Sequence, residues 1–304
     1  MDDTSNVTYL TLDGFVELHK YRYLYFMIMF VMYILIISCN STIICLIWIH
    51  KTLHEPMYIF IAALLLNSVL YSTNIYPKLL ADFLSEKQIL TYPLCLFQAF
   101  IYYSLATSEF LLLTAMSYDR YVSICKPLQY PAIMRKTTVI LLLVLAWLVP
   151  LCELTVSVVL YANLKICSFT LKGIFCNNSI YSIQCVRSVT LAIYGVFMLL
   201  NMVLFPLLFI LFTYTRILII SYRIRRKAAQ TCLPHLLVLI NLSCFVTYDV
   251  FIVRLEADIP RIAHLIISIQ MISYHPLFNP IIYGLKMKEI SKHLKKLLAQ
   301  VKSH

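Results

Sequence analysis

Long stretches without a charged side chain constrain this chain more than any other feature. Six stretches free of Asp, Glu, Lys and Arg run for 21 to 28 residues, at 23–50, 56–77, 88–108, 188–215, 228–248 and 262–285. A further stretch, 137–164, is interrupted only by Glu153. An α-helix needs about 20 apolar residues to cross a bilayer, and continuous runs exclude a transmembrane barrel, whose strands alternate. The sequence therefore predicts seven membrane-spanning helices.

The predicted fold is an all-α, seven-transmembrane bundle with short connections. The spans are expected at 23–49, 57–82, 93–125, 137–161, 188–222, 230–254 and 261–283. An N-terminal tail occupies 1–22, the bundle 23–283 and a C-terminal segment 284–304. Residues 162–187 are predicted as a loop, and the basic C-terminal segment as an amphipathic helix that lies on the inner leaflet and contacts its lipids.

Composition excludes several classes of function. Of the 304 residues, 61% are hydrophobic and 13% are charged, against roughly 25% charged in soluble domains. With only 4 glycines no glycine-rich phosphate loop forms, and no metal cluster or catalytic triad is evident. We therefore expect neither an enzyme nor a bound cofactor. The net charge of +11 lies between apolar spans, which favours a membrane surface over nucleic acid as its partner.

The basic residues predict the orientation. With the N-terminus outside, the inner segments carry sixteen basic and three acidic residues, whereas the outer segments carry nine and eight. Inner loops of membrane proteins are enriched in Lys and Arg. We therefore expect a multi-pass plasma-membrane protein with an extracellular N-terminus.

Cysteines and glycosylation sequons agree with this orientation. Four cysteines fall on the predicted outer side: Cys95, Cys167, Cys176 and Cys185. They allow three pairings, and the sequence alone does not choose among them, although we favour Cys95 with Cys176. A bond from Cys95 to the loop would tie it to the third span. The sequons at Asn6 and Asn177 also lie on the outer side, where glycans are added.

Three motifs stand at the inner ends of predicted spans. They read MSYDRYVSICKPLQY from Met116, PLFNPIIY from Pro276 and KAAQTCLPHL from Lys227. Together with Pro56-Met57-Tyr58 and Ser221-Tyr222, they resemble the signatures of olfactory receptors, a branch of the rhodopsin-like G-protein-coupled receptors. The resemblance extends from Asn40 to Lys288, and the Asn67-Ser68 pair is similar to the fish branch of the family. Two positions depart from the family pattern, Ser117 in place of alanine and Ser243 in place of tyrosine.

The resemblance implies a function and a set of switch residues. It implies a receptor in olfactory cilia that binds a small odorant from outside and activates a stimulatory G protein to raise cyclic AMP. Its coupling and activation residues would be Asp119, Arg120, Tyr121, Tyr222, Asn279, Pro280 and Tyr283. Pro280 also removes a backbone donor and kinks its helix.

The predicted ligand pocket lies between the third, sixth and seventh spans. Its candidates on the third span are Tyr102, Tyr103, Ala106 and Thr107, and the resemblance adds Val246, Val250 and Ile269. Asp249 has two interpretations: it contacts a polar ligand, or it pairs with Arg254 or Arg261.

Polar residues inside the predicted spans are Asn40, Asn67, Ser68 and Glu109. Rhodopsin-like receptors commonly bind sodium through an Asp on the second helix, where Ser68 stands here. Three interpretations of Glu109 remain open: structural hydrogen bonding, a sodium ligand and a proton-linked role. Glu153 is expected to bond a neighbouring helix.

Rival functions make different demands on the sequence. A rhodopsin-like receptor for an amine, lipid or peptide would share the fold, but the Lys126-Pro127-Leu128 and Lys227-Ala228 segments argue against it. A transporter needs paired broken helices and an internal repeat, which four glycines and an odd number of spans disfavour. A passive structural protein does not require Arg120.

Overall fold

Six long apolar helices form the described part of the bundle. The structure, a computed structural model, describes residues 8–162, 164–186, 188–220, 238–240, 242–244 and 260–302. The helices long enough to cross a membrane are α1 (Leu18–Ile49), α2 (Pro56–Leu84), α3 (Tyr92–Cys125), α5 (Lys136–Ala162), the continuous Val189–Ile220 segment and α9 (Arg261–Lys286). They match six of the seven predicted spans. The remaining span, 230–254, lies outside the described residues except for 238–240 and 242–244, which are helical.

Local sequence explains where several helices begin and end. Pro56 opens α2 and Pro93 lies in the first turn of α3, where a missing N–H costs nothing. Cys125 ends α3 two residues before Pro127, consistent with the restricted backbone before proline. The Val189–Ile220 segment consists of α6 (Val189–Leu199), a π-turn η4 (Leu200–Leu204) and α7 (Phe205–Ile220). The π-turn precedes Pro206, which lacks the N–H that a regular helix would use.

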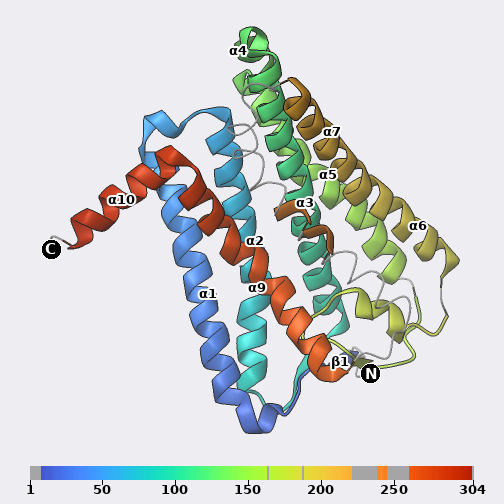
Figure 1. Ribbon diagram of the computed structural model, residues 1–304. Coiled ribbons are helices and arrows are strands. Elements are labelled where there is room, and N and C mark those ends of the chain that lie inside the picture. Colours follow the sequence, from blue (N-terminus) through green and yellow to red (C-terminus); the bar gives the residue numbers. More distant parts are fainter. Residues whose placement is uncertain are drawn as a thin grey trace, which may run out of the picture.

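The shorter elements lie at the two ends of the bundle (Figure 1). One end carries the strands β1 (Tyr9–Leu12), β2 (Ile89–Thr91) and β3 (Thr170–Leu171), and the 3-10 helix η3 (Asn178–Ile183). It also carries the disulfides Cys95–Cys176 and Cys167–Cys185, so we call it the disulfide end. The opposite end carries η1 (Lys51–Leu53), η2 (Pro127–Gln129), α4 (Tyr130–Ile133) and α10 (Lys288–Lys302), and we call it the Asp119 end.

Two predicted boundaries need correction. Residues 8–22 are not a plain tail, because they contain β1 and the first residues of α1, which begins at Leu18. The predicted 162–187 loop contains β3 and η3. The two strands share one cause: β1 pairs with β2 and β3, segments distant in the sequence.

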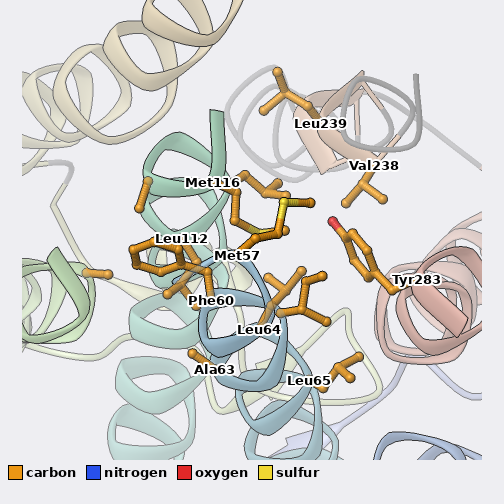
Figure 2. Packing of buried hydrophobic residues seen from close by; sticks show 14 of the residues in the cluster. Met57, Phe60, Ala63, Leu64, Leu65, Leu112, Met116, Val238, Leu239 and Tyr283 are labelled. Atoms are coloured by element: carbon orange, nitrogen blue, oxygen red, sulfur yellow. The ribbon is translucent and has the colours of Figure 1, made fainter. Parts of the chain in front are cut away.

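The centre of the bundle is formed by α2, α3 and α9. In their most apolar windows 50%, 61% and 50% of the residues are buried, against 17% in α5 and in the Val189–Ile220 segment. The peripheral helices expose large apolar side chains such as Phe30, Leu148 and Phe212, as lipid contact requires. Figure 2 shows the core near the Asp119 end, where Phe60 and Leu64 of α2 face Leu112 and Met116 of α3. Val238 and Leu239 of the sixth predicted span complete this core beside Tyr283.

Candidate functional site

A cavity of about 160 Å³ lies near the disulfide end, between α3, α5, the Val189–Ile220 segment and η3. Most of its wall is apolar, including Leu96, Ala99, Phe100, Leu154, Val158, Met198 and Met202. Polar groups come from Thr107, Ser157, Asn177, Asn178, Tyr103, Tyr161, Tyr181 and Tyr194. An apolar cavity with a few convergent polar groups is the usual form of a small-molecule site.

The predicted pocket residues divide between this cavity and the neighbouring core. Tyr103 and Thr107 line the cavity. Tyr102 is 3% exposed and packs against Tyr71 and Phe175, with ring centroids 5.3 and 5.1 Å away. Ala106 and Ile269 pack against the same core cluster as Tyr102 rather than lining the cavity. Val246, Asp249 and Val250 lie outside the described residues.

The cavity therefore lies farther toward α5 and α6 than the sequence predicts. Its face of α3 is Leu96, Ala99, Phe100, Tyr103 and Thr107, which recur at helical spacing. Sequence analysis did not identify Ser157, Tyr181 or Tyr194. A single serine in the apolar run of α5 was the only available signal for this wall. Gly195 of α6 also lines it, one of only 4 glycines in the chain.

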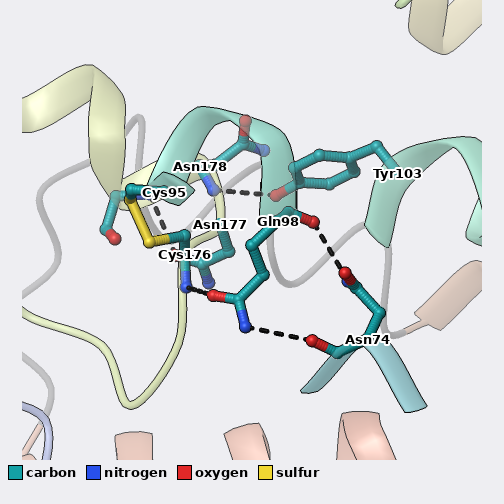
Figure 3. The surroundings of a disulfide bond; sticks show 8 residues. Asn74, Cys95, Gln98, Tyr103, Cys176, Asn177 and Asn178 are labelled. Atoms are coloured by element: carbon teal, nitrogen blue, oxygen red, sulfur yellow. Dashed lines mark hydrogen bonds between the residues drawn. A yellow bond between two sulfur atoms is a disulfide. The ribbon is translucent and has the colours of Figure 1, made fainter. Parts of the chain in front are cut away.

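The disulfide Cys95–Cys176 holds the loop over α3 (Figure 3). Gln98 Oε1 accepts a hydrogen bond from Cys176 N at 3.1 Å, and Asn178 N donates to Tyr103 Oη at 2.8 Å. Gln98 is itself bonded to Asn74 of α2: Asn74 Nδ2 donates to the backbone oxygen of Gln98 at 3.0 Å, and Gln98 Nε2 donates to the backbone oxygen of Asn74 at 3.2 Å. The loop wall of the cavity is thus fixed to two helices.

Asn177 occupies a position that disfavours the predicted glycan. It is 5% exposed and caps η3, where its Oδ1 accepts a hydrogen bond from Ser179 N at 3.1 Å. Because a glycan needs an accessible side-chain amide at the surface, this conformation argues against modification at Asn177. The other predicted sequon, at Asn6, lies outside the described residues.

A buried charged pair lies at the Asp119 end. Asp119 is fully buried, Arg120 Nη2 lies 3.3 Å from Asp119 Oδ2, and Tyr130 Oη donates to Asp119 Oδ1 at 2.8 Å. Burial, together with the Asp119 carboxylate, raises the pKa of Tyr130 well above its usual range. Sequence analysis predicted Asp119 and Arg120 but did not identify Tyr130, whose bond requires α4 to fold back on α3. Tyr121 is half-buried at this end and Tyr222 lies outside the described residues.

Glu109 belongs to a buried polar network between the two ends. Asn279 Nδ2 donates to Glu109 Oε1 at 2.9 Å and to Ser68 Oγ at 3.1 Å. His275 Nδ1 lies 3.6 Å from the same Glu109 oxygen. Asn67 bonds elsewhere, donating to Leu105 O at 2.9 Å and accepting from Trp147 Nε1 at 3.2 Å.

This network fits hydrogen bonding better than a sodium ion. Hard cations take oxygen ligands, whereas the groups beside the Glu109 carboxylate are nitrogen atoms of Asn279 and His275. Among the described residues no group of three or more His, Cys, Asp and Glu side chains is placed to hold a metal. Of the three interpretations of Glu109, these contacts favour structural hydrogen bonding over a sodium ligand.

Glu153 bonds a neighbouring helix, as predicted. Asn201 Nδ2 donates to Glu153 Oε1 at 2.7 Å, and Tyr194 Oη donates to the Glu153 backbone oxygen at 2.7 Å. Because Tyr194 also lines the cavity, these bonds join the α5 and α6 walls. Arg261 pairs with Asp13 at 3.1 Å.

One exposed apolar side chain at the Asp119 end was not singled out by sequence analysis. Leu128 of η2 is 97% exposed. It follows directly after the end of α3, so it lies at the foot of the helix that carries the buried charged pair. An isolated leucine is common on protein surfaces, but its place in η2, just beyond the end of the helix that carries Asp119 and Arg120, makes it a candidate contact.

Comparisons with known proteins agree with these features. A family model described as olfactory receptor matches residues 29–301. Olfactory receptor 11A1 of Homo sapiens is 35% identical over 303 residues, covering 96% of this chain and 94% of that protein. Olfactory receptor 10J4 of Homo sapiens is 33% identical, covering 97% and 96%. Olfactory receptor 6B9 of Mus musculus is 30% identical, covering 98% and 96%.

Proposed function

The chain belongs to the olfactory receptor family, a family of multi-pass G-protein-coupled receptors and not of enzymes, and from that premise we propose how its two ends work together. A small odorant binds the cavity at the disulfide end, and the Asp119 end then activates a stimulatory G protein that raises cyclic AMP. One observation carries the proposal: α3 lines the cavity as far as Thr107 and carries the charged pair at Asp119 and Arg120. Twelve residues of helix separate Thr107 from Asp119, about 18 Å at 1.5 Å per residue.

The proposed orientation places the disulfide end outside the cell and the Asp119 end in the cytosol. Disulfides form in oxidising compartments, and both of the described ones lie at one end of the bundle. Basic residues dominate the segments at the other end. We expect an epitope tag at the N-terminus to be accessible on intact cells, and a C-terminal tag only after permeabilisation. The cilia of olfactory sensory neurons are the proposed location, and Asn6 the proposed glycan site.

The chemistry of the cavity supports a small, neutral ligand. No charged side chain lines it within the described residues, and a buried ligand charge without a partner would be costly. Its volume of about 160 Å³ is close to the roughly 150 Å³ of an apolar cavity that accepts benzene. The proposed ligand is therefore about the size of a single ring or of a short chain.

One polar group on the ligand would complete the cavity's hydrogen bonding. The Ser157 hydroxyl on α5 and the Tyr181 hydroxyl on η3 make no hydrogen bond within the described ranges. A ligand hydroxyl or carbonyl can bond either of them. Matched odorant pairs that differ only in that oxygen test this idea. Ser157→Ala and Tyr181→Phe should weaken responses to the oxygenated member and leave those to the hydrocarbon member unchanged.

Asp249 provides the test for the opposite ligand chemistry. It lies outside the described residues, so its predicted contact with a ligand stays a prediction. Suppose that the wild-type receptor responds to a cationic amine but to no neutral odorant, and that Asp249→Asn abolishes the response to the amine. The neutral-ligand proposal would then be wrong. Retained responses to neutral odorants in that variant would support it.

The decisive experiment for the function is a cyclic-AMP assay in transfected cells. Cells expressing the receptor should give saturable responses to some members of a panel of small water-soluble and volatile odorants. Arg120→Ala should abolish the response at equal surface density, because the charged pair at the G-protein end is lost. A full response from Arg120→Ala, or no response from a well-expressed wild-type receptor, would contradict the proposal.

A further inference from the structure

The N-terminal strand β1 is the central strand of a three-stranded sheet at the disulfide end, in the order β2-β1-β3. It pairs antiparallel with β2, with Leu10 opposite Leu90, and parallel with β3, with Thr11 opposite Thr170. β2 directly precedes α3, and β3 belongs to the loop that reaches the cavity. The strand thus connects the two segments that meet at the Cys95–Cys176 disulfide.

Backbone hydrogen bonds hold the strand from both sides. Thr11 N donates to Phe169 O at 2.8 Å and Asp13 N to Leu171 O at 2.8 Å, both toward the loop. Leu12 N donates to Gln88 O at 2.9 Å and Tyr92 N to Thr8 O at 3.0 Å, both toward α3. The backbone N–H and C=O groups of a central strand form hydrogen bonds on both edges, so β1 is an integral part of this sheet.

The buried face of β1 lies directly behind the cavity wall. Leu10 is fully buried and Leu12 is 3% exposed, while Tyr9 and Thr11 point outward. The two leucines share one apolar cluster with Leu96, Ala99 and Ile180. Those three residues also line the cavity. The strand therefore packs against side chains that contact the cavity, without contributing to its wall.

Two glycines set how closely the strand approaches the loop. Gly14 N donates to Gly173 O at 3.2 Å, and a Cβ added at Gly14 would lie 2.4 Å from Gly173 C and 2.7 Å from Ile174 N. Both contacts are with backbone atoms, which cannot rotate away. Half of the 4 glycines in the chain meet at this point, and the contact leaves no room for a side chain at Gly14.

An ion pair links the same segment to α9. Arg261 Nη2 lies 3.1 Å from Asp13 Oδ2, with both side chains largely exposed. Exposed pairs add little stability, so this pair orients the segment more than it anchors it. The packing of Leu10 and Leu12 and the Gly14 contact provide the main attachment.

From these contacts we propose that the N-terminal strand positions the cavity wall, so that Leu10, Leu12 and Gly14 set the receptor's sensitivity to odorants without touching them. The inference rests on the proposed function for its odorant readout. The strand holds the loop at β3, the loop continues into η3, and η3 supplies Ile180 and Tyr181 to the cavity. Displacing the strand shifts that wall relative to α3.

The test compares Gly14→Ala and Leu10→Ala with Thr11→Ala in the purified full-length receptor. Gly14→Ala pushes β1 away from Gly173, and Leu10→Ala removes buried contacts more mildly, which preserves the test if Gly14→Ala folds poorly. Thr11→Ala is the matched control, because it lies on the exposed face of the same strand and keeps its backbone bonds. Hydrogen exchange of residues 166–186 gives a readout that needs no odorant.

We expect faster loop exchange in Gly14→Ala and Leu10→Ala than in Thr11→Ala. In transfected cells at equal surface density, we also expect both variants to raise the odorant concentration for half-maximal response about tenfold, within the range for positions remote from a ligand. Unchanged loop exchange in both variants overturns the proposal. Faster exchange with an unchanged odorant response also overturns it, because the strand would then not set sensitivity. If loop exchange rises but the wild-type receptor responds to no odorant, positioning of the loop is supported and the proposed receptor function is what fails.

Discussion

At the residue scale, α9 shows how a missing backbone donor is compensated inside a helix. Pro280 has no N–H, so the carbonyl of Pro276, four residues earlier, lacks its helical partner. Asn40 Nδ2 of α1 donates to Pro276 O at 2.8 Å and to Ile36 O at 2.7 Å. The adjacent Asn279 is another polar side chain near the freed carbonyl, but it donates to Glu109 and Ser68. Asn40 therefore supplies the donor that Pro280 lacks.

Asn40→Ala should therefore lower the thermal stability of the purified receptor. The substitution leaves a buried carbonyl unsatisfied, which costs about 1–3 kcal/mol, and it loosens the contact between α1 and α9. Thr42→Ala is the control on the same helix, since Thr42 is only half-buried and its hydroxyl donates to Ser38 O of its own helix. Equal unfolding temperatures for the two variants would show that Asn40 is not the essential partner.

Tyr130 gives a second prediction at this scale. Its hydroxyl stabilises the charged form of Asp119, and Asp119 holds Arg120. Tyr130→Phe removes that bond with almost no change of shape, so Arg120 is held less firmly and basal cyclic AMP should rise. Asp119→Asn should raise it further, because it removes the charge itself. Basal signalling is measured at equal surface density, and a basal level unchanged in both variants would exclude this restraint on Arg120.

At the element scale, the charge-free stretches predicted the six described spans well because lipid requires long apolar helices. They could not predict β1, β2 or β3, which are short strands whose partners lie far apart in the chain. The alternation of Leu10 and Leu12 is too brief to indicate a strand by itself. α10 was predicted as an amphipathic helix from its periodicity, and the structure adds its contact with α1.

That contact predicts a pH dependence. The rings of His50, at the end of α1, and His293, on α10, lie 3.9 Å apart between centroids. The pKa of His293 lies below its ordinary value of 6.5, first because the ring is partly removed from water and then because the His50 ring and the Lys296 ammonium are close. Lys292 also lowers this pKa, whereas Glu289 raises it. The neutral ring therefore favours the docked helix. Docking should be complete above pH 6.5 and weaken as the pH falls below it through the lowered pKa.

A fluorescent probe on α10 that reports its distance from α1 measures this change. Lowering the pH from 7.5 to about 5 should loosen the helix in the wild-type receptor. His293→Phe keeps a ring against His50 and cannot be protonated at that position, so it should respond less. A transition of the same size in both proteins would assign the titration to other groups.

At the scale of the whole molecule, the sequence specified the two ends of the receptor better than it specified the cavity. The Asp119-Arg120-Tyr121 segment and the four disulfide-bonded cysteines are local patterns, and the structure places them at opposite ends of the bundle. The cavity depends on how α5 and α6 face α3, and the apolar runs of α5 and α6 contain few polar residues that indicate which face is turned inward. Tyr102 was assigned to the cavity and packs in the core, while Ser157 and Tyr181 were missed.

Because the two ends are separate, a substitution can perturb one end without the other, and Leu128 is the residue we choose to substitute at the Asp119 end. It is 97% exposed, so Leu128→Ala should leave folding and ligand binding unchanged. If the G protein buries this side chain, its loss removes about 1.5–3 kcal/mol of contact energy, and the G-protein concentration for half-maximal nucleotide exchange should rise about tenfold or more. Leu128→Met retains an apolar contact and should lose much less. Equal nucleotide-exchange curves for the alanine variant and the wild-type receptor would exclude Leu128 from the surface that contacts the G protein. A changed odorant affinity in the absence of G protein would show that this substitution perturbs both ends.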